Sequence, residues 1–246
     1  MLIAATPAAA VAWHTALEMA GIFVGMRVFA AGMRRRGDAI GAHGGFAVAV
    51  GCIVGAVVGS RVAVWLDRPD VALAAWDTVV PWTMGQSIVG ALIGGWAGVE
   101  VGKRVGGVRR STGDAFIVPL ALGIAIGRLG CFVAGLHDDT YGVATSLPWG
   151  VDFGDGVPRH PTQLYDIAVV AALALALLGA RERLGRVPGL AFKLFLAGYL
   201  AWRVAIDHWK PVHHAWPGGL SGLQVLALAF LVLYLPLVVR AARSLR

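Results

Sequence analysis

Seven apolar stretches, each close to the length of a membrane span, constrain this chain more than any other feature. They run approximately over 10–32, 41–66, 82–101, 113–135, 162–180, 187–208 and 221–239. A helix needs roughly 20 mainly apolar residues to cross the hydrocarbon core of a bilayer. Only 14% of the 246 residues are charged and 58% are hydrophobic, which excludes a soluble globular enzyme. The sequence predicts an all-α integral membrane protein of about seven transmembrane helices in one polytopic domain, 1–246.

Basic residues gather in every second connection between these stretches, which predicts the orientation of the chain. Clusters lie at 34–36, 103–110, 181–186 and 240–246, whereas the connections near 67–81, 136–161 and 209–220 carry few. The positive-inside rule places such clusters in the cytoplasm. We therefore expect the N-terminus outside, the C-terminus in the cytoplasm, and no nucleic-acid partner, because the net charge of +7 is divided among these clusters. The first stretch lacks a preceding Lys or Arg, so we expect a membrane helix and not a secretory signal.

The connection 136–161 is the only outside segment long enough to form a small extracytoplasmic head. Asp155 and Gly156 lie between short apolar runs, a pattern that favours a tight hairpin. Pro148, Pro158 and Pro161 exclude a continuous helix over this segment.

Glycines recur at helical spacing within the second and third apolar stretches. They are Gly51, Gly55 and Gly59 in the second, and Gly90, Gly94 and Gly98 in the third. Small residues at this spacing let two membrane helices approach closely, so this pattern predicts helix packing and no cofactor site.

Four arginines lie within the apolar stretches, where each costs roughly 2.5–3.5 kcal/mol at mid-bilayer. Arg27 and Arg61 are best explained by snorkelling or structural ion pairs. Arg128 and Arg203 lie toward the outer ends of their stretches, below the expected head. Two guanidinium groups at similar depth can hold a phosphate through bidentate hydrogen bonds. We therefore expect a site for an anionic lipid headgroup.

Several motifs, taken in order, resemble the prolipoprotein diacylglyceryl transferases of the bacterial inner membrane. The matching segments are SRVAVWL (60–66), GRLGCF (127–132), Gly142, LPWGV (147–151), RHPTQLYD (159–166) and GYLAWRVAID (198–207). The resemblance extends over about residues 14–240, with the same number of spans and the same orientation.

This resemblance implies a reaction, its partners and a set of site residues. The family transfers the diacylglyceryl group of phosphatidylglycerol to the cysteine thiol of a prolipoprotein, and it uses no metal or cofactor. Carried over by motif, Arg128, Arg203 and His160 are the candidate catalytic residues. The candidate substrate-binding residues are Arg128, Cys131, Gly142, Arg159, Gln163, Tyr165 and Tyr199. The expected location is the bacterial plasma membrane.

The chain departs from the family at residues that border the lipid headgroup. Val89 stands where the family has a histidine that is held to be the base, and Cys131, Ala134 and Leu136 replace two asparagines and a glutamate. A second hypothesis is therefore a paralogue that binds anionic phospholipid without the same transfer. His160 is a candidate replacement base.

Other candidates remain within the same region of the sequence. His137, Asp138 and Asp139 offer further titratable groups for a base or its partner. Cys131 beside Arg128 is a candidate nucleophile, although a small buried residue in the space of an asparagine is the simpler interpretation. A third hypothesis, a small-molecule transporter, is disfavoured because no internal repeat is visible.

Overall fold

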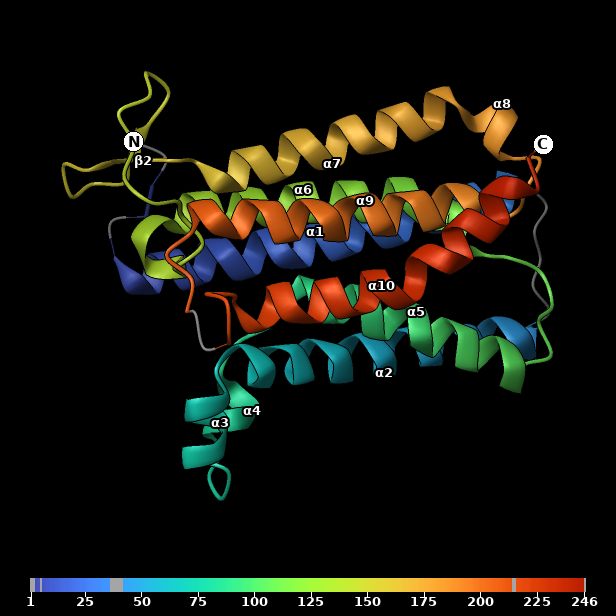
Figure 1. Ribbon diagram of the computed structural model, residues 1–246, viewed down its shortest axis with the longest axis horizontal. Helices are drawn as coiled ribbons and strands as arrows, with labels where there is room; N and C mark the ends of the chain where they lie inside the picture. The colour runs from blue at the N-terminus through green and yellow to red at the C-terminus, as the bar shows by residue number, and fades with distance from the viewer. Residues whose placement is uncertain (1–2, 5, 36–41, 214–215, 246) are drawn as a thin grey trace. The chain divides into compact units, whose positions relative to one another are not determined.

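The computed structural model describes residues 3–4, 6–35, 42–213 and 216–245 and is mainly helical (Figure 1). Arg36 and Arg246 of the basic clusters lie outside the described residues. Five described helices are long and apolar enough to cross a membrane: Pro7–Arg34, Gly44–Asp67, Gly113–Asp138, Thr162–Gly179 and Gly222–Arg243. The class predicted from the sequence, an all-α membrane protein, is confirmed in this form.

The chain divides into two compact units that interleave along the sequence. The first unit takes Met1–Arg36, Thr112–Pro211 and Ser244–Arg246. Its elements are α1 (Pro7–Arg35), η1 (Gly113–Phe116), α6 (Ile117–Ala134), η2 (Gly135–Asp138), β1 (Val151–Asp152), β2 (Pro158–Arg159), α7 (Thr162–Gly179), α8 (Arg181–Leu184), α9 (Leu190–Ile206) and η3 (Asp207–Trp209).

The second unit takes Gly37–Ser111 and Val212–Arg243. Its elements are α2 (Ala42–Asp67), α3 (Pro69–Ala74), α4 (Val80–Thr83), α5 (Ile88–Val105) and α10 (Gly222–Arg243). In the part of the chain that the structure describes, each of the seven apolar stretches contains one long helix. Helix α9 is the shortest of these with 17 residues, and α5, α6 and α7 have 18 each.

The third apolar stretch becomes helical later than its predicted start at 82. Pro81 and Thr83 belong to the separate short helix α4, and the chain then turns through Gly85, whose φ of 103° favours glycine. Ser87 begins α5 as its N-cap, with its side chain accepting a hydrogen bond from the Gly90 N–H at 3.4 Å. Turn and capping chemistry therefore decided this boundary, and hydropathy alone did not show it.

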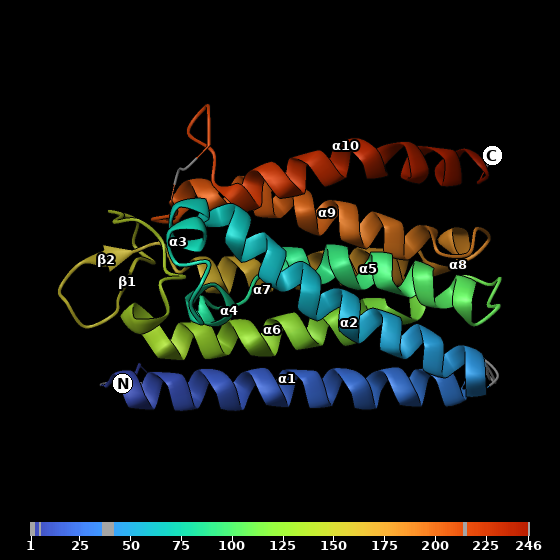
Figure 2. The ribbon, with the colours of Figure 1, turned by 90° about the horizontal axis from the view of Figure 1, so that it is seen from below.

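Helices α2 and α5 pack closely along the predicted glycine stripe in the second unit. A Cβ atom added at Gly94 would lie 2.1 Å from the carbonyl oxygen of Gly55, and one added at Gly59 would lie 2.3 Å from that of Gly90. The pairing of residue numbers shows that the two helices run antiparallel. The sequence prediction of glycine-mediated packing is confirmed, and Figure 2 shows the two helices side by side.

Helices α1 and α6 pair antiparallel in the first unit, which positions the residues discussed below. Gly21 lies against Gly123, and Gly130 lies against the backbone of His14. Because a Cβ at Gly130 would come within 3.3 Å of the His14 carbonyl oxygen, this glycine lets α1 approach the end of α6 that carries Cys131.

The carboxylate of Asp114 in η1 holds the start of α9 in place. The Asp114 carboxylate accepts hydrogen bonds from the backbone N–H groups of Gly189 at 2.6 Å and Phe192 at 2.9 Å. These N–H groups belong to the first turn of α9, where a helix leaves its donors unpaired and favours a negative charge. Asp114 thereby determines where α9 begins.

The segment between α6 and α7 contains the predicted hairpin. Strands β1 and β2 pair antiparallel with Val151 opposite Arg159 and Asp152 opposite Pro158. The Asp152 carboxylate accepts hydrogen bonds from the N–H groups of Gly154, Asp155 and Gly156, and so closes the loop.

We expect Gly94→Ala to lower the free energy of unfolding by roughly 1–3 kcal/mol, because its Cβ would overlap the backbone of α2. Unfolding in mixed detergent micelles measures this change. Gly95→Ala is the matched control, since its Cβ would make an ordinary contact with the Ala56 Cβ at 3.6 Å. Equal losses in the two variants would contradict the proposed close packing.

Candidate functional site

The carboxylate of Asp166 forms ion pairs with three cationic side chains in the first unit. Its Oδ2 atom lies 2.9 Å from Arg128 Nε, 3.3 Å from Arg203 Nη1 and 3.5 Å from Lys210 Nζ. The other oxygen, Oδ1, accepts a hydrogen bond from Trp202 Nε1 at 2.7 Å. Asp166 is fully buried, so its charge depends on these partners for compensation. We call Asp166, Arg128, Arg203, Lys210 and Asp207 the cation cluster.

Helical spacing brings three members of the cluster together. Arg203, Asp207 and Lys210 lie four and three residues apart, and η3 continues the turn of α9, so these side chains share one face. Arg203 Nη2 bonds Asp207 Oδ1 at 2.9 Å. Asp166 lies near the start of α7.

The cluster carries an excess of positive charge. Three cations face two carboxylates, and the side chains of Arg203 and Lys210 are only 6% and 5% exposed. Burial, together with the neighbouring Arg203 and Arg128, lowers the pKa of Lys210 to about 7, because Asp166 and Asp207 raise it by less. Near neutral pH, the charge of Lys210 therefore responds to any anion that enters.

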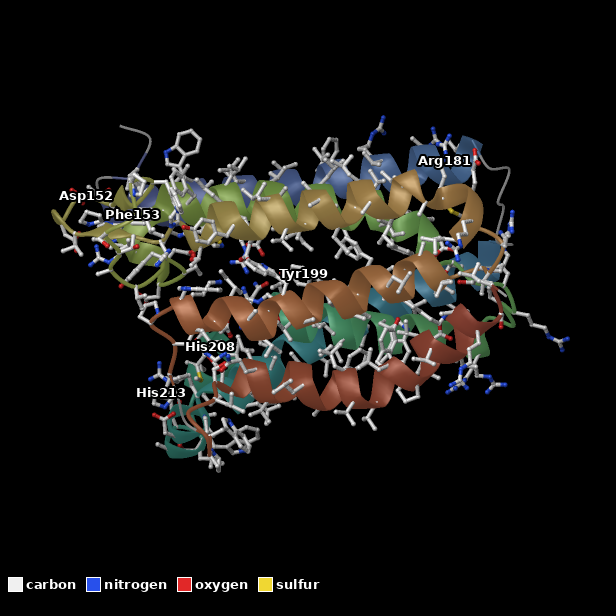
Figure 3. The ribbon with its side chains drawn as sticks, turned by 45° about the horizontal axis from the view of Figure 1, so that its top comes forward. Asp152, Phe153, Arg181, Tyr199, His208 and His213 are labelled. Carbon is white, nitrogen blue, oxygen red and sulfur yellow. The ribbon has the colours of Figure 1, made fainter. Side chains whose placement is uncertain are left out.

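Unused polar atoms beside the cluster offer contacts to such an anion. Within the described residues, Arg203 Nε, the Tyr199 hydroxyl and Gln163 Oε1 are buried without a hydrogen-bond partner. Tyr199 lies beside Arg128 and projects from α9 toward α7 (Figure 3). Buried donors without partners are costly, so an arginine N–H and a tyrosine hydroxyl in this position favour a bound acceptor such as a phosphate oxygen.

His160 and Tyr165, two further candidates, form a separate pair at the start of α7. His160 Nδ1 lies 3.2 Å from the Tyr165 hydroxyl, which also accepts a hydrogen bond from Trp149 Nε1 at 2.8 Å. Gly142 packs against the backbone of His160, where an added Cβ would lie 2.5 Å from the His160 carbonyl oxygen. Gly142 therefore permits a close approach of two segments.

Arg159 points into the hairpin and pairs with its loop. It makes a bidentate ion pair with Asp155, at 2.6 and 2.7 Å, and its guanidinium lies 5.3 Å from the centre of the Tyr141 ring. The hydrogen bonds from Arg159 hold the pKa of the Asp155 carboxyl below its usual range. Among the described residues, the contacts of Arg159 are thus with the hairpin loop and Tyr141 and not with the cation cluster.

A second group of polar side chains, which we call the His14 cluster, lies at the end of α6. It comprises His14 of α1, Cys131 of α6 and Asp138 of η2. His14 Nδ1 lies 2.8 Å from Asp138 Oδ1, and Arg128 Nη1 lies 3.8 Å from Cys131 Sγ. Arg128 therefore contacts both clusters.

The structure brings together only part of the set predicted from the sequence. Arg128, Arg203 and Tyr199 meet, whereas His160 and Arg159 make their contacts elsewhere. Sequence reasoning missed the central position of Asp166 and the participation of Lys210 and His14. The spacing from Arg203 through Asp207 to Lys210 could have revealed Lys210, but no local pattern links His14 to residues over a hundred positions away.

Comparisons with known proteins point to one family. A family model described as prolipoprotein diacylglyceryl transferase matches residues 1–240. Three relatives bear the name phosphatidylglycerol–prolipoprotein diacylglyceryl transferase. The protein of Geobacter sulfurreducens is 33% identical over 67% of this chain and 63% of its own length. Those of Bordetella parapertussis and Bordetella avium are 34% and 32% identical, over 63% and 78% of this chain and 60% and 75% of their own lengths.

The chain spans about three fifths of the length of the Geobacter sulfurreducens and Bordetella parapertussis proteins that it matches. The family model, in contrast, extends over nearly the whole chain. On this match, the chain belongs to the prolipoprotein diacylglyceryl transferase family.

Proposed function

We propose that this protein transfers the diacylglyceryl group of phosphatidylglycerol to the cysteine thiol of a prolipoprotein. The observation that carries the proposal is the cation cluster, in which one buried carboxylate holds Arg128, Arg203 and Lys210 together. Family membership supplies the reaction, and the names of the relatives supply the two substrates.

The chemistry requires a cationic site at the leaving group. A thiolate attacks the glyceryl carbon, a carbon–sulfur bond forms, and the bond from that carbon to a phosphate oxygen breaks. Glycerol-1-phosphate leaves with the electron pair of the broken bond. Negative charge therefore grows on the phosphate, and fixed buried donors stabilise it better than water does.

The roles of the site residues follow from their positions. Arg128 and Arg203 hold the phosphate, and the Tyr199 hydroxyl donates a hydrogen bond to a headgroup oxygen. Lys210 supplies a third positive charge, and a bound anion favours the protonated form of its amine. Gln163, buried one turn before Asp166 on α7, offers an unpaired side-chain amide oxygen for a glycerol hydroxyl.

The remaining candidates belong to the outer part of the site in this proposal. His160 is a proton acceptor held by Tyr165, and Cys131 borders the headgroup beside Arg128. Gly142 and Arg159 shape the segment above, because Gly142 keeps His160 close and Arg159 ties the hairpin to Asp155.

The same proposal includes an arrangement in the bacterial plasma membrane. All seven long helices span it, including α5 and α9, and residues 136–161 form the extracytoplasmic head. Asp152 of the hairpin and Arg181 of a basic cluster lie at opposite ends of the first unit (Figure 3). This separation supports the hairpin outside, the basic loops and C-terminus in the cytoplasm, and the N-terminus outside.

The second candidate function is a paralogue that binds anionic phospholipid and acts on a different acceptor or on none. The observation that favours it is the absence of the family histidine in this chain, where Val89 is fully buried on α5. In this alternative the cation cluster keeps its lipid, and the chemical step differs.

We expect Arg128→Ala to lower diacylglyceryl transfer to a lipobox peptide by at least about 100-fold, because a donor to the developing charge is lost. Arg128→Lys should retain part of the activity through its charge alone. Transfer is measured by mass spectrometry of the thioether peptide, with Arg27→Gln as the control for an arginine of a span outside the cluster.

Two results would count against the proposal. Undiminished transfer by Arg128→Ala would remove the cluster from the reaction. Bound phosphatidylglycerol in the unsubstituted protein, with no transfer at all, would favour the paralogue.

We expect the affinity for phosphatidylglycerol to fall by roughly tenfold as the pH rises from about 6 to about 8, because Lys210 loses its proton near pH 7. The sign follows from the lowered pKa: the amine is charged below about 7 and neutral above it. Lipid binding is measured by titration into detergent micelles.

Lys210→Arg is the control for this pH dependence, since arginine stays charged throughout the range. Its binding curve should be flat with pH. A pH dependence that persists unchanged in Lys210→Arg would show that another group is responsible.

A further inference from the structure

The His14 cluster lies outside the cation cluster, and its donor atoms converge on one point. One atom from each of His14, Cys131 and Asp138 lies within 4.8 Å of the other two. Cys131 is buried, and the side chains of His14 and Asp138 are 32% and 14% exposed. The three residues come from α1, α6 and η2, so tertiary packing and not local sequence assembles them.

The chemistry of the three donors is that of a transition-metal site. An imidazole nitrogen, a thiol sulfur and a carboxylate oxygen are the three ligand types that Zn²⁺ prefers in proteins. His14 Nδ1 pairs with Asp138 Oδ1 at 2.8 Å, so two of the three donor atoms already face each other. A metal that binds there would displace the proton between them, because a ligating imidazole is neutral and a ligating carboxylate is ionised.

The outer oxygen of Asp138 is already held in position. The Thr140 hydroxyl donates a hydrogen bond to Asp138 Oδ2 at 2.6 Å, and the same hydroxyl accepts one from Gln163 Nε2 at 3.4 Å. Asp139 has a left-handed φ of 51°, which turns the chain so that Thr140 faces back toward Asp138. Outer partners of this kind orient ligating carboxylates in metal sites.

The geometry needs only a small adjustment to take a metal. Tetrahedral Zn²⁺ with bonds of about 2.0–2.1 Å places nitrogen and oxygen ligands roughly 3.3 Å apart. The Nδ1–Oδ1 separation of 2.8 Å would open by a few tenths of an ångström, which a side-chain rotation supplies.

The fourth coordination position has space beside it. A cavity of about 180 Å³ borders the cluster, lined in part by His14, Thr15, His137 and Asp138. Three protein ligands with an open fourth position are the arrangement of catalytic zinc sites, whereas structural sites are closed by four protein ligands.

The charge balance and the position of Arg128 link this cluster to the reaction. Zn²⁺ with one thiolate and one carboxylate is neutral, so a second thiolate would leave one negative charge. Arg128 Nη1 at 3.8 Å from Cys131 Sγ is placed to compensate it. Since Arg128 Nε also binds Asp166, a thiolate held here lies next to the proposed phosphate site.

We propose that His14, Cys131 and Asp138 bind Zn²⁺, and that the open position takes the acceptor thiol as a thiolate. The proton of the thiol leaves to solvent on coordination, because a coordinated thiol is deprotonated. The metal-bound sulfur then attacks the glyceryl carbon, with the bonds formed and broken as above and no change in oxidation state. The site would supply the thiolate in a chain that has Val89 in place of the family histidine. The metal site stands on its own geometry, and only its acceptor rests on the proposed function.

Co²⁺ is the probe for the metal site, because its absorption bands report tetrahedral geometry and thiolate ligation. The full-length protein in detergent, freed of metal by a chelator, is titrated with Co²⁺ alone. We expect a single Co²⁺ per chain, with a thiolate-to-cobalt charge-transfer band that excess Zn²⁺ abolishes by displacement.

Substitutions test the ligand set with matched controls. Cys131→Ser should abolish the charge-transfer band, and His14→Gln and Asp138→Asn should weaken Co²⁺ binding by at least about 100-fold, because even outer partners contribute about 10–100-fold. Cys52→Ser and Asp139→Asn are the controls, since Cys52 is the other free thiol and Asp139 the adjacent carboxylate. Circular dichroism and gel filtration confirm that each variant is folded.

Addition of a lipobox peptide to the Co²⁺ protein tests the open position. We expect its cysteine to shift the charge-transfer band, and the same peptide with serine in place of cysteine to leave it unchanged. Failure of the unsubstituted protein to bind Co²⁺ better than Cys131→Ser would overturn the metal site. A charge-transfer band that does not change when the cysteine peptide is added would overturn the acceptor assignment. Both readouts are independent of transfer, so failure of the proposed function alone leaves them intact.

Discussion

A carboxylate with no access to water must have its charge compensated by neighbouring groups, and Asp166 meets this need with three cations. Arg128, Arg203 and Lys210 come from α6, α9 and the turn after η3, and only Asp166 brings them to one point. The arrangement of the first unit depends on this contact, because without Asp166 the three cations would have only the carboxylate of Asp207 among the named members of the cluster. The same contact leaves one positive charge in excess, and this excess is the physical basis of the proposed phosphate site.

Arg128 connects the two clusters of the first unit. Its Nε atom bonds Asp166, while its Nη1 atom approaches the sulfur of Cys131 beside His14 and Asp138. In the proposed reaction, one side of this guanidinium faces the phosphate and the other side faces the attacking sulfur. In that proposal a sulfur, an imidazole and a carboxylate near this arginine supply the thiolate, in a chain that has Val89 where the family resemblance implies a histidine.

The sequence predicted the elements of the fold better than the contacts of the site. Apolar length and glycine spacing located the long helices and the α2–α5 packing, because both depend on local composition. Local reasoning placed the start of α5 too early, since Gly85 and Ser87 set that boundary. Arg128 and Arg203 were found because charge in an apolar stretch is conspicuous. Asp166 was hidden in a polar run, and His14 joins Cys131 only through the approach of α1 to Gly130, which no sequence period reveals.

Unfolding of Asp166→Asn in mixed detergent micelles, beside Asp155→Asn, tests the central role of this carboxylate most directly. The account predicts a loss of about 3–5 kcal/mol for Asp166→Asn, because three buried cations lose their shared partner. Added phosphatidylglycerol should restore more of that loss than zwitterionic phosphatidylcholine, since the headgroup phosphate replaces the missing charge. Asp155→Asn, which breaks an exposed pair in the hairpin, should unfold close to the unsubstituted protein. An Asp166→Asn protein that is as stable as the Asp155→Asn control, with no preference for the anionic lipid, would contradict the account.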